Sequence, residues 1–211
     1  ETLVGLLDKW MHFMVFLLAY YEATTVSHYL EPAEVALREK VKDDSNFNIL
    51  VRPSQMTVVE EDEMAQLKLS LQTEISTDDI DAYIQCFPHV ALNTYSRDTV
   101  RAHVANELQK LAHDPASDRK DRIDDIVKEK IELARQQQAI LDRLNDPEVR
   151  ALVSIIQSMG YWRFRLKNLW AGQEYLCLPL FEELSHRLNV DIQTLMSVYN
   201  SEDIFNQLIG R

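Results

Sequence analysis

The chain has 211 residues and a formal net charge of −12, and 46% of its residues are hydrophobic. This apolar fraction is large enough to build a core, which excludes a globally disordered protein. The acidic balance argues against nonspecific binding to nucleic acid, because such binding depends on Lys and Arg displacing counterions from phosphates. The sequence contains only 4 Gly and 6 Pro, which favours long helices over a fold with many turns. We therefore predict an all-α fold, an irregular multi-helix bundle.

The first predicted helix lies near the N-terminus and is strongly apolar. Its apolar residues recur at helical spacing, at Leu3, Leu6, Trp10, Phe13, Leu17 and Tyr20. The most apolar run, residues 11–21, is about half of the roughly 20 residues that a bilayer crossing needs. We therefore expect a helix that is buried on most of its circumference, no signal peptide and no membrane contact.

Proline and capping residues predict where the next helices begin and end. Glu31-Pro32 restarts a helix that runs from residue 33 to about 41, and a polar loop over residues 42–48 follows it. The N-cap patterns after that loop are Thr57 with Glu60 in a capping box, Ser76 or Thr77, and Ser96. Phe87-Pro88 ends the helix that Ser76 or Thr77 begins.

A charged segment, residues 113–120, divides the chain into an N-terminal helical subdomain, 1–112, and a C-terminal one, 121–211. The two could equally form one continuous domain. After the link, apolar spacing predicts a long helix up to Asn145, and Asp146-Pro147 begins a second one. We predict that these two long helices pack antiparallel across the short corner between them.

The residues that carry chemistry in enzymes do not form a recognisable pattern in this sequence. None of the six histidines has a second His or Cys at metal-ligand spacing, and the glycines lie too far apart for a phosphate-binding loop. Cys86 and Cys177 have no nearby cysteine partner, which is typical of reduced thiols in a cytoplasmic protein. We predict no catalytic residue, no metal ligand and no cofactor of this chain itself.

The best candidate for ligand or interface contacts is the segment 161–170, in which cations alternate with aromatic residues. Such a pattern can hold a phosphate or stack a nucleotide. The alternative is that the tryptophans and leucines face the core while the cations lie outside, because Arg163 and Lys167 are four residues apart and share one side. The candidate contacts are Trp162, Arg163, Arg165, Lys167 and Trp170.

The closing segment has the outline of a helix-turn-helix DNA-binding motif, with Asn189 as the turn residue and 192–198 as the second helix. This second helix contains no Lys or Arg, and acidic residues surround it. A recognition helix must contact base edges and phosphates, so this charge distribution argues against DNA binding.

Residues 178–208, LPLFEELSHRLNVDIQTLMSVYNSEDIFNQL, resemble the helical region of phosphoenolpyruvate-utilising phosphotransferases. This group includes phosphoenolpyruvate synthase, pyruvate phosphate dikinase and rifampicin phosphotransferase. Residues 168–176, NLWAGQEYL, and 50–67, LVRPSQMTVVEEDEMAQL, are similar to stretches of the same region. The resemblance implies a parent protein in which an ATP-grasp domain binds nucleotide and a swivelling domain carries a phosphorylated histidine.

The chain departs from both of those catalytic domains. None of its histidines lies in a Gly/Thr-rich run, and it has no ATP-grasp phosphate loop, so no catalytic residue is carried over. The resemblance implies a noncatalytic helical linker or substrate-facing module, whose partners are other domains of the same polypeptide or a separate protein. ATP and Mg would then belong to the parent enzyme. The alternatives are a free-standing helical interaction or regulatory protein and, less favoured, a helix-turn-helix DNA-binding protein.

Overall fold

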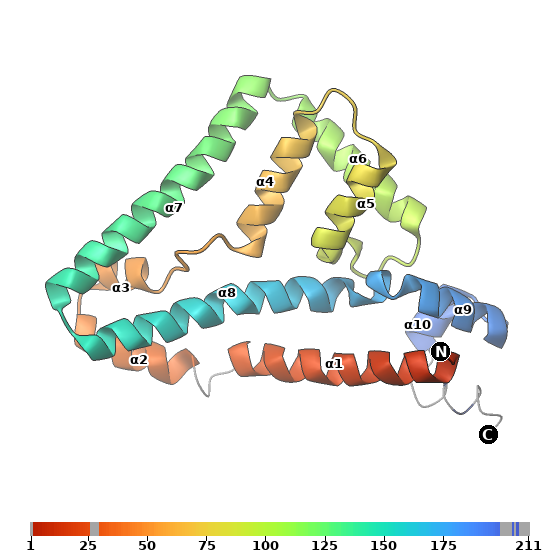
Figure 1. Cartoon of the computed structure of the whole chain (residues 1–211), viewed down its shortest axis with the longest axis horizontal. Coiled ribbons are helices and arrows are strands. Elements are labelled where there is room, and N and C mark those ends of the chain that lie inside the picture. Colours follow the sequence, from red (N-terminus) through yellow and green to blue (C-terminus); the bar gives the residue numbers. More distant parts are fainter. Residues whose placement is uncertain (1, 26–29, 199–203, 205, 207–211) are drawn as a thin grey trace.

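The structure is a computed structural model that describes residues 2–25, 30–198, 204 and 206. Every regular element in these residues is a helix, which confirms the predicted all-α class (Figure 1). The elements in chain order are α1 (Leu3–Thr25), α2 (Leu30–Val41), α3 (Asp44–Leu50), α4 (Val58–Ser70), α5 (Thr77–Cys86), the 3-10 helix η1 (Pro88–Ala91), α6 (Arg97–Ala112), α7 (Ala116–Leu144), α8 (Pro147–Leu176), α9 (Leu178–Leu188) and α10 (Ile192–Val198).

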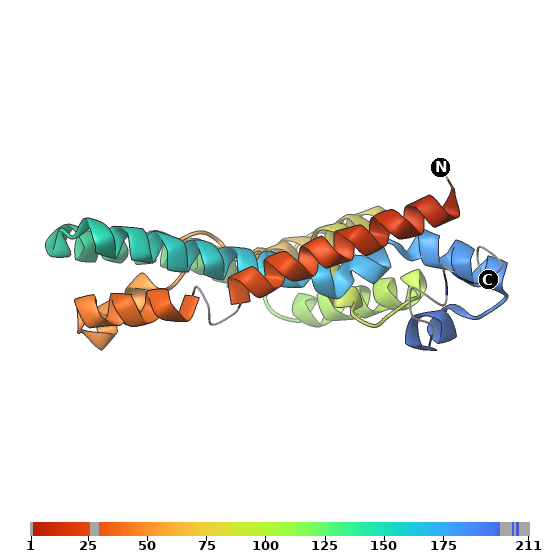
Figure 2. The same cartoon turned by 90° about the horizontal axis from the view of Figure 1, so that it is seen from below.

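The two longest helices, α7 and α8, form a flat frame with α4 (Figures 1 and 2). The chain runs along α7 to a corner at Asn145 and returns along α8, and the two helices contact each other near this corner and diverge away from it. Helix α4 occupies the space between them and contacts both. Helices α1 and α2 lie along the other side of α8. The two long, oppositely directed helices that the sequence predicts therefore exist, but they pack on each other only near the corner, because α4 lies between them beyond it.

The corner between α7 and α8 is built by the residues that the sequence indicates. Asn145 has φ 46° and ψ 37°, a left-handed conformation that Asn tolerates better than most residues. The carboxylate of Asp146 then accepts hydrogen bonds from the backbone N–H groups of Glu148 and Val149, at 2.8 and 3.3 Å. Asp146 is the N-cap of α8 and Pro147 is its first residue, which confirms the predicted restart.

The predicted N-caps are confirmed at Thr57, Ser76 and Ser96, and Thr57 closes a capping box with Glu60. The polar loop predicted over residues 42–48 is wrong, because α3 begins there. The Asp43 carboxylate accepts a hydrogen bond from the Asn46 backbone N–H at 2.7 Å and caps this helix. Polar residues thus form its exposed first turn, while Phe47 is buried in the core.

Three hydrophobic clusters hold the helices together, and each contains residues from both sides of the predicted link at 113–120. The first joins α2 and α3 to the corner of α7 and α8, the second joins α4, α5 and α6 to Tyr175 of α8, and the third joins α1 to α9 and α10. Residues 116–120 of that link form the start of α7. The buried Arg119 there donates a hydrogen bond to the Ser70 hydroxyl at 2.9 Å.

Two further polar side chains of α7 tie it to the segments that fill the frame. Lys130 donates to the Pro53 carbonyl at 3.0 Å and forms an ion pair with Glu60 at 2.9 Å. Gln137 is buried and donates to the carbonyls of Ile49 and Arg52, at 2.7 and 2.8 Å. Helix α7 is therefore held along its length although it diverges from α8.

The expectation that α1 is buried on most of its circumference is wrong. Leu7 and Leu17 are buried, but Val15 and Phe16 are 69% and 59% exposed. A single neighbouring helix, α8, covers α1 over most of its length, with α9 beside its first turns. The apolar part of α1 begins at Leu3, so it is longer than the run of residues 11–21 on which the membrane expectation was based. Residues 3–20 of α1 are long and apolar enough to cross a membrane by length and composition, and 11% of them are buried.

Candidate functional site

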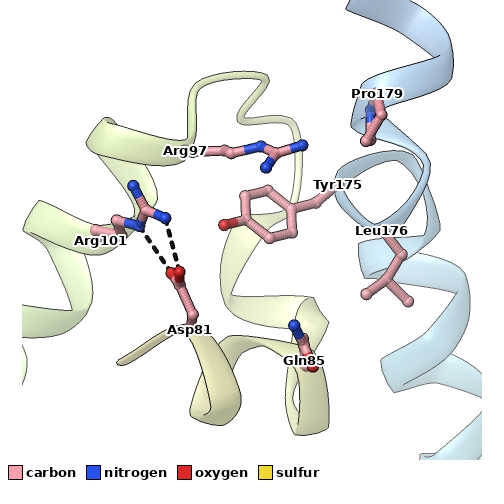
Figure 3. Close-up of a pocket in the computed structure, with 7 residues that line it drawn as sticks. All are labelled: Asp81, Gln85, Arg97, Arg101, Tyr175, Leu176 and Pro179. Carbon is pink, nitrogen blue, oxygen red and sulfur yellow. Dashed lines mark hydrogen bonds and ion pairs between the residues drawn. The ribbon is translucent and has the colours of Figure 1, made fainter. Parts of the chain in front are cut away.

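A cleft of about 450 Å³ lies where α5 and α6 face the end of α8 and the start of α9 (Figure 3). This volume is within the range of clefts that bind small molecules, roughly 300–1,000 Å³. Its lining combines cations, an aromatic ring and apolar groups: Asp81, Gln85, Arg97, Arg101, Tyr175, Leu176 and Pro179. Two arginines and one aspartate are its charged lining residues.

The two arginines of the cleft differ in how they are bound. Arg101 forms a two-pronged ion pair with Asp81, with N–O distances of 2.7 and 2.6 Å, and this pairing lowers the pKa of the Asp81 carboxyl. The guanidinium of Arg97 lies 3.8 Å from the carboxylate of Glu182 on α9, which is beyond hydrogen-bond distance. One guanidinium is therefore fixed by the protein, and the other is held only loosely.

Tyr175 lies between these cations. Its hydroxyl points toward Arg101 and Asp81, and Arg97 extends above its ring (Figure 3). Burial raises the pKa of Tyr175, and the negative charge of Asp81 adds to this rise, so the phenol stays protonated near neutral pH. The hydroxyl is thus available as a hydrogen-bond donor inside the cleft.

Sequence reasoning missed this cleft because its residues come from distant elements. Arg97 and Arg101 occupy the first turns of α6 at a spacing of four residues, which places them on one side of that helix. Tyr175 lies more than 70 positions further along the chain, at the end of α8. The signal in the sequence was the spacing of Arg97 and Arg101 just after the Ser96 cap. This spacing could not indicate that α5 and the end of α8 lie opposite these arginines.

The structure does not bring the five candidate contacts of segment 161–170 together. Arg165 binds the Glu61 carboxylate of α4 through N–O distances of 2.7 and 2.8 Å, and its Nε donates to the Tyr161 hydroxyl at 2.6 Å. It therefore joins α8 to α4. The side chains of Arg163 and Lys167 are exposed.

The alternative expectation, that the tryptophans of this segment face the core, is wrong. Trp162 and Trp170 are 53% and 40% exposed. Trp10 of α1 donates from its indole Nε1 to the Gln173 side chain of α8 at 2.6 Å, so α1 crosses α8 close to this segment. A single helix is too narrow to cover the whole apolar side of α8, and both rings stay partly exposed.

A second polar cluster, the Asp62–His89 junction, connects α4, α5, η1 and α8. The Asp62 carboxylate accepts hydrogen bonds from Tyr83 at 2.5 Å and from Gln66 at 3.0 Å, and it pairs with His89 Nε2 at 3.2 Å. The other ring nitrogen of His89 donates to the side-chain oxygen of Asn168 in α8, at 2.6 Å. Both nitrogens therefore face acceptors, which favours the doubly protonated imidazolium.

The pKa values of the junction follow from these contacts. The hydrogen bond to Asp62 raises the pKa of His89 above its ordinary value of 6.5. Burial raises the pKa of Asp62, but the hydrogen bonds from His89, Tyr83 and Gln66 outweigh it and bring that pKa below its ordinary value. A histidine with both nitrogens bound to the protein cannot accept a proton or attack a substrate without breaking this cluster. The junction is a structural clamp.

The junction also depends on a close approach between η1 and α8. A Cβ atom added to Gly172 would lie 2.2 Å from the backbone carbonyl carbon of Pro88, so a larger residue does not fit there. Asn168, one turn earlier, accepts from the His89 backbone N–H at 3.2 Å and donates to the Cys86 carbonyl at 3.1 Å. Among the residues that the structure describes, no group of three or more His, Cys, Asp or Glu side chains is placed to hold a metal ion.

The predicted hairpin at the C-terminal end has the expected turn. Asn189 has φ 52°, and its backbone N–H donates to the His186 carbonyl at 3.3 Å. The Val190 N–H donates to the Ser185 carbonyl at 3.1 Å, which completes a Schellman motif at the end of α9. Phe181, Leu184 and Leu195 of this hairpin pack with Leu7 of α1. The hairpin therefore joins the two ends of the described chain.

Comparisons with known proteins give no match to a family model, to a curated protein or to a solved structure.

Proposed function

We propose that this chain is a noncatalytic helical module of a larger phosphoenolpyruvate-utilising phosphotransferase, in which it spaces or orients the catalytic domains. The resemblance of residues 178–208 to that group supports the kind of parent enzyme. The observation that carries the proposal is the apolar outer surface of α1, which the described residues leave uncovered.

The outer surface of α1 is defined by exposed apolar side chains that share one side of the helix: Leu6, Phe13, Phe16 and Tyr20. Large contiguous apolar patches on a protein surface mark sites of interaction. Residues 6, 9, 13, 16 and 20 follow one another at alternating spacings of three and four, the spacing of a seam between two helices. Four of these five positions are apolar. The surface therefore fits a helix presented by another domain of the same polypeptide.

The internal polar groups support a structural role for the chain. Asp62 and His89 bind each other and their neighbours, Arg165 binds Glu61, and Lys130 binds Glu60. These side chains hold helices to one another across the frame. Nucleotide, Mg and the phosphorylated histidine would belong to other domains of a cytoplasmic parent enzyme.

A free-standing helical interaction protein is the second candidate, because the outer surface of α1 would equally suit a separate partner. DNA binding is less favoured, since α10 carries no cation for phosphates. The coding sequence beside this segment discriminates between these functions. A phosphotransferase parent requires a Gly-rich nucleotide-binding domain on one side and a histidine-bearing domain on the other.

The proposal is tested by hydrogen exchange of α1 in the intact gene product and in this chain alone. We expect slower exchange of the α1 amides in the intact protein, because a second domain would cover them. Phe16→Ser should abolish this protection, whereas Ile131→Ser, which changes an equally exposed apolar residue on α7, should preserve it.

Three results would contradict the proposal. The first is equal exchange of α1 in both proteins, and the second is phosphorylation of a histidine of this chain when it is incubated alone with ATP. The third is stable flotation of the chain with phosphatidylcholine vesicles, which would assign the outer surface of α1 to lipid.

A further inference from the structure

We propose that the cleft between α5, α6 and the end of α8 binds a small organic anion, with an oxyanion group on Arg97 and an apolar body against Tyr175, Leu176 and Pro179. This inference is independent of the parent enzyme proposed above. It rests on the charge, the hydrogen-bonding capacity and the shape of the cleft.

The residues that line the cleft include two cations and one anion, although the chain as a whole is acidic. Arg97 and Arg101 face a single lining aspartate, Asp81, whereas the chain carries a net charge of −12. Asp81 is fully engaged by Arg101 through two short hydrogen bonds. Arg101 also lies 3.4 Å from Asp98, so Arg97 is the guanidinium of the cleft that has no carboxylate of the described residues within hydrogen-bond distance. It stands in the first turn of α6, where the helix dipole also favours an anion.

Arg97 is ready to bind an oxyanion. Its guanidinium presents donors in a planar fork that matches a carboxylate or a phosphate. Glu182, at 3.8 Å, lies too far away to take up these donors and can give way to a ligand that forms true hydrogen bonds. The ion pair between Arg101 and Asp81 ties α6 to α5. The wall of the cleft next to Arg97 therefore keeps its shape.

The remaining lining residues define the rest of the ligand. The protonated Tyr175 hydroxyl points into the space between the arginines and Asp81 and can donate to the same oxyanion (Figure 3). Leu176 and Pro179 line the opposite wall with apolar atoms, and Gln85 offers an amide. A phosphate or carboxylate group on a small apolar or aromatic body satisfies all of these groups at once. Inorganic phosphate satisfies only the polar ones.

Calorimetric titration of the chain with phenyl phosphate, benzoate, inorganic phosphate and benzyl alcohol tests this inference. We expect the two aromatic anions to bind, inorganic phosphate to bind at least about 10-fold more weakly than phenyl phosphate, and benzyl alcohol not to bind. Arg97→Ala should weaken phenyl phosphate binding at least about 10-fold, because it removes a charge-assisted bidentate contact. Tyr175→Phe should weaken it about threefold.

The matched control is Arg163→Ala, which removes an exposed arginine of α8 outside the cleft and should leave binding unchanged. Arg97→Lys keeps the positive charge but lacks the planar fork of the guanidinium. It replaces Arg97→Ala if that variant has a lower helix content. We expect Arg97→Lys to bind phenyl phosphate more weakly than the unaltered chain. Equal weakening by Arg163→Ala and Arg97→Ala would overturn the proposal. So would equal affinity for benzyl alcohol and phenyl phosphate, or no saturable binding of either aromatic anion.

Discussion

Two sides of α8 are covered in opposite ways. On one side, η1 packs so closely that only glycine fits at position 172, and Asn168, His89 and Asp62 exchange directional hydrogen bonds. On the other side, α1 lies along α8 through apolar contacts and one indole hydrogen bond, and much of its own apolar surface stays exposed. The first side is a fixed joint, in which the backbones fit closely and the polar side chains are hydrogen-bonded. The second is an incomplete layer, which a further element can extend.

Filling the closest contact of the fixed joint should have the largest effect. Gly172→Ala would place a Cβ 2.2 Å from the Pro88 backbone, which forces η1 away from α8. We expect the free energy of unfolding to fall by about 2–3 kcal/mol, measured by urea denaturation.

The matched control for this change is Gly160→Ala in the same helix. Its Cβ would lie 3.3 Å from the Pro53 side chain, and alanine improves the helix propensity there, so its effect should stay below about 1 kcal/mol. Equal losses in the two variants would show that η1 does not pack on α8 as described.

Removing the charge at the centre of the joint should have the next largest effect. Asp62→Asn takes away the anion that pairs with His89 and accepts from Tyr83. We expect a loss of about 2 kcal/mol near pH 6, since the imidazolium would be left without its buried partner. Glu132→Gln, which breaks an exposed ion pair with Arg135 on α7, should cause no measurable loss. A stable Asp62→Asn variant would show that the joint relies on packing alone.

The pH dependence of that loss sharpens the comparison. The pKa of His89 is raised on folding, so its contribution is complete below 6.5 and is lost as the pH rises through the folded value. The pKa of Asp62 is lowered on folding, so its contribution is complete above 3.8 and is lost as the pH falls through the folded value. The difference in unfolding free energy between the unaltered chain and Asp62→Asn should therefore be greatest between pH 3.8 and 6.5. A difference that stays constant from neutral to alkaline pH would refute the ionic part of the joint.

The smallest effect is expected on the incomplete side. Phe16→Ser changes a side chain of α1 that is 59% exposed, so the isolated chain should lose less than about 1 kcal/mol. The neighbouring Leu17→Ala changes a buried side chain and should cost about 2–3 kcal/mol. Thermal or urea unfolding compares the two. A large loss in Phe16→Ser would place Phe16 inside the fold and remove the contrast between the two sides of α8.

Local signals in the sequence predicted the starts and ends of helices well. Thr57, Ser96 and Asp146 act as caps because each bonds backbone groups within three residues, and such contacts can be read from adjacent positions. The corner at Asn145 and the turn at Asn189 are local in the same sense. The loop predicted over residues 42–48 failed because a short helix can have a polar exposed turn and still bury Phe47.

The arrangement of the helices was beyond these local signals. The apolar pattern of α1 predicted burial, but burial requires neighbours, and α8 with α9 covers only part of its circumference. The arginines of segment 161–170 suggested a ligand, but Arg165 is used by Glu61, 104 positions away. The cleft of Arg97, Arg101 and Tyr175 likewise forms only when α6 meets the end of α8. Such long-range pairs depend on how helices are placed, which periodicity does not specify.

The polar side chains that attach α7 to the segments before it have a mechanical consequence. Arg119, Lys130 and Gln137 attach this helix at successive distances from the corner at Asn145, over a span of about 27 Å at the helical rise of 1.5 Å per residue. Without these contacts, a force on the far end of α7 would bend the chain at the corner. Each contact transfers part of this force to α4 or to the segment that precedes α4. The angle between α7 and α8 is therefore fixed, and groups attached at the far ends of these two helices would keep a constant separation.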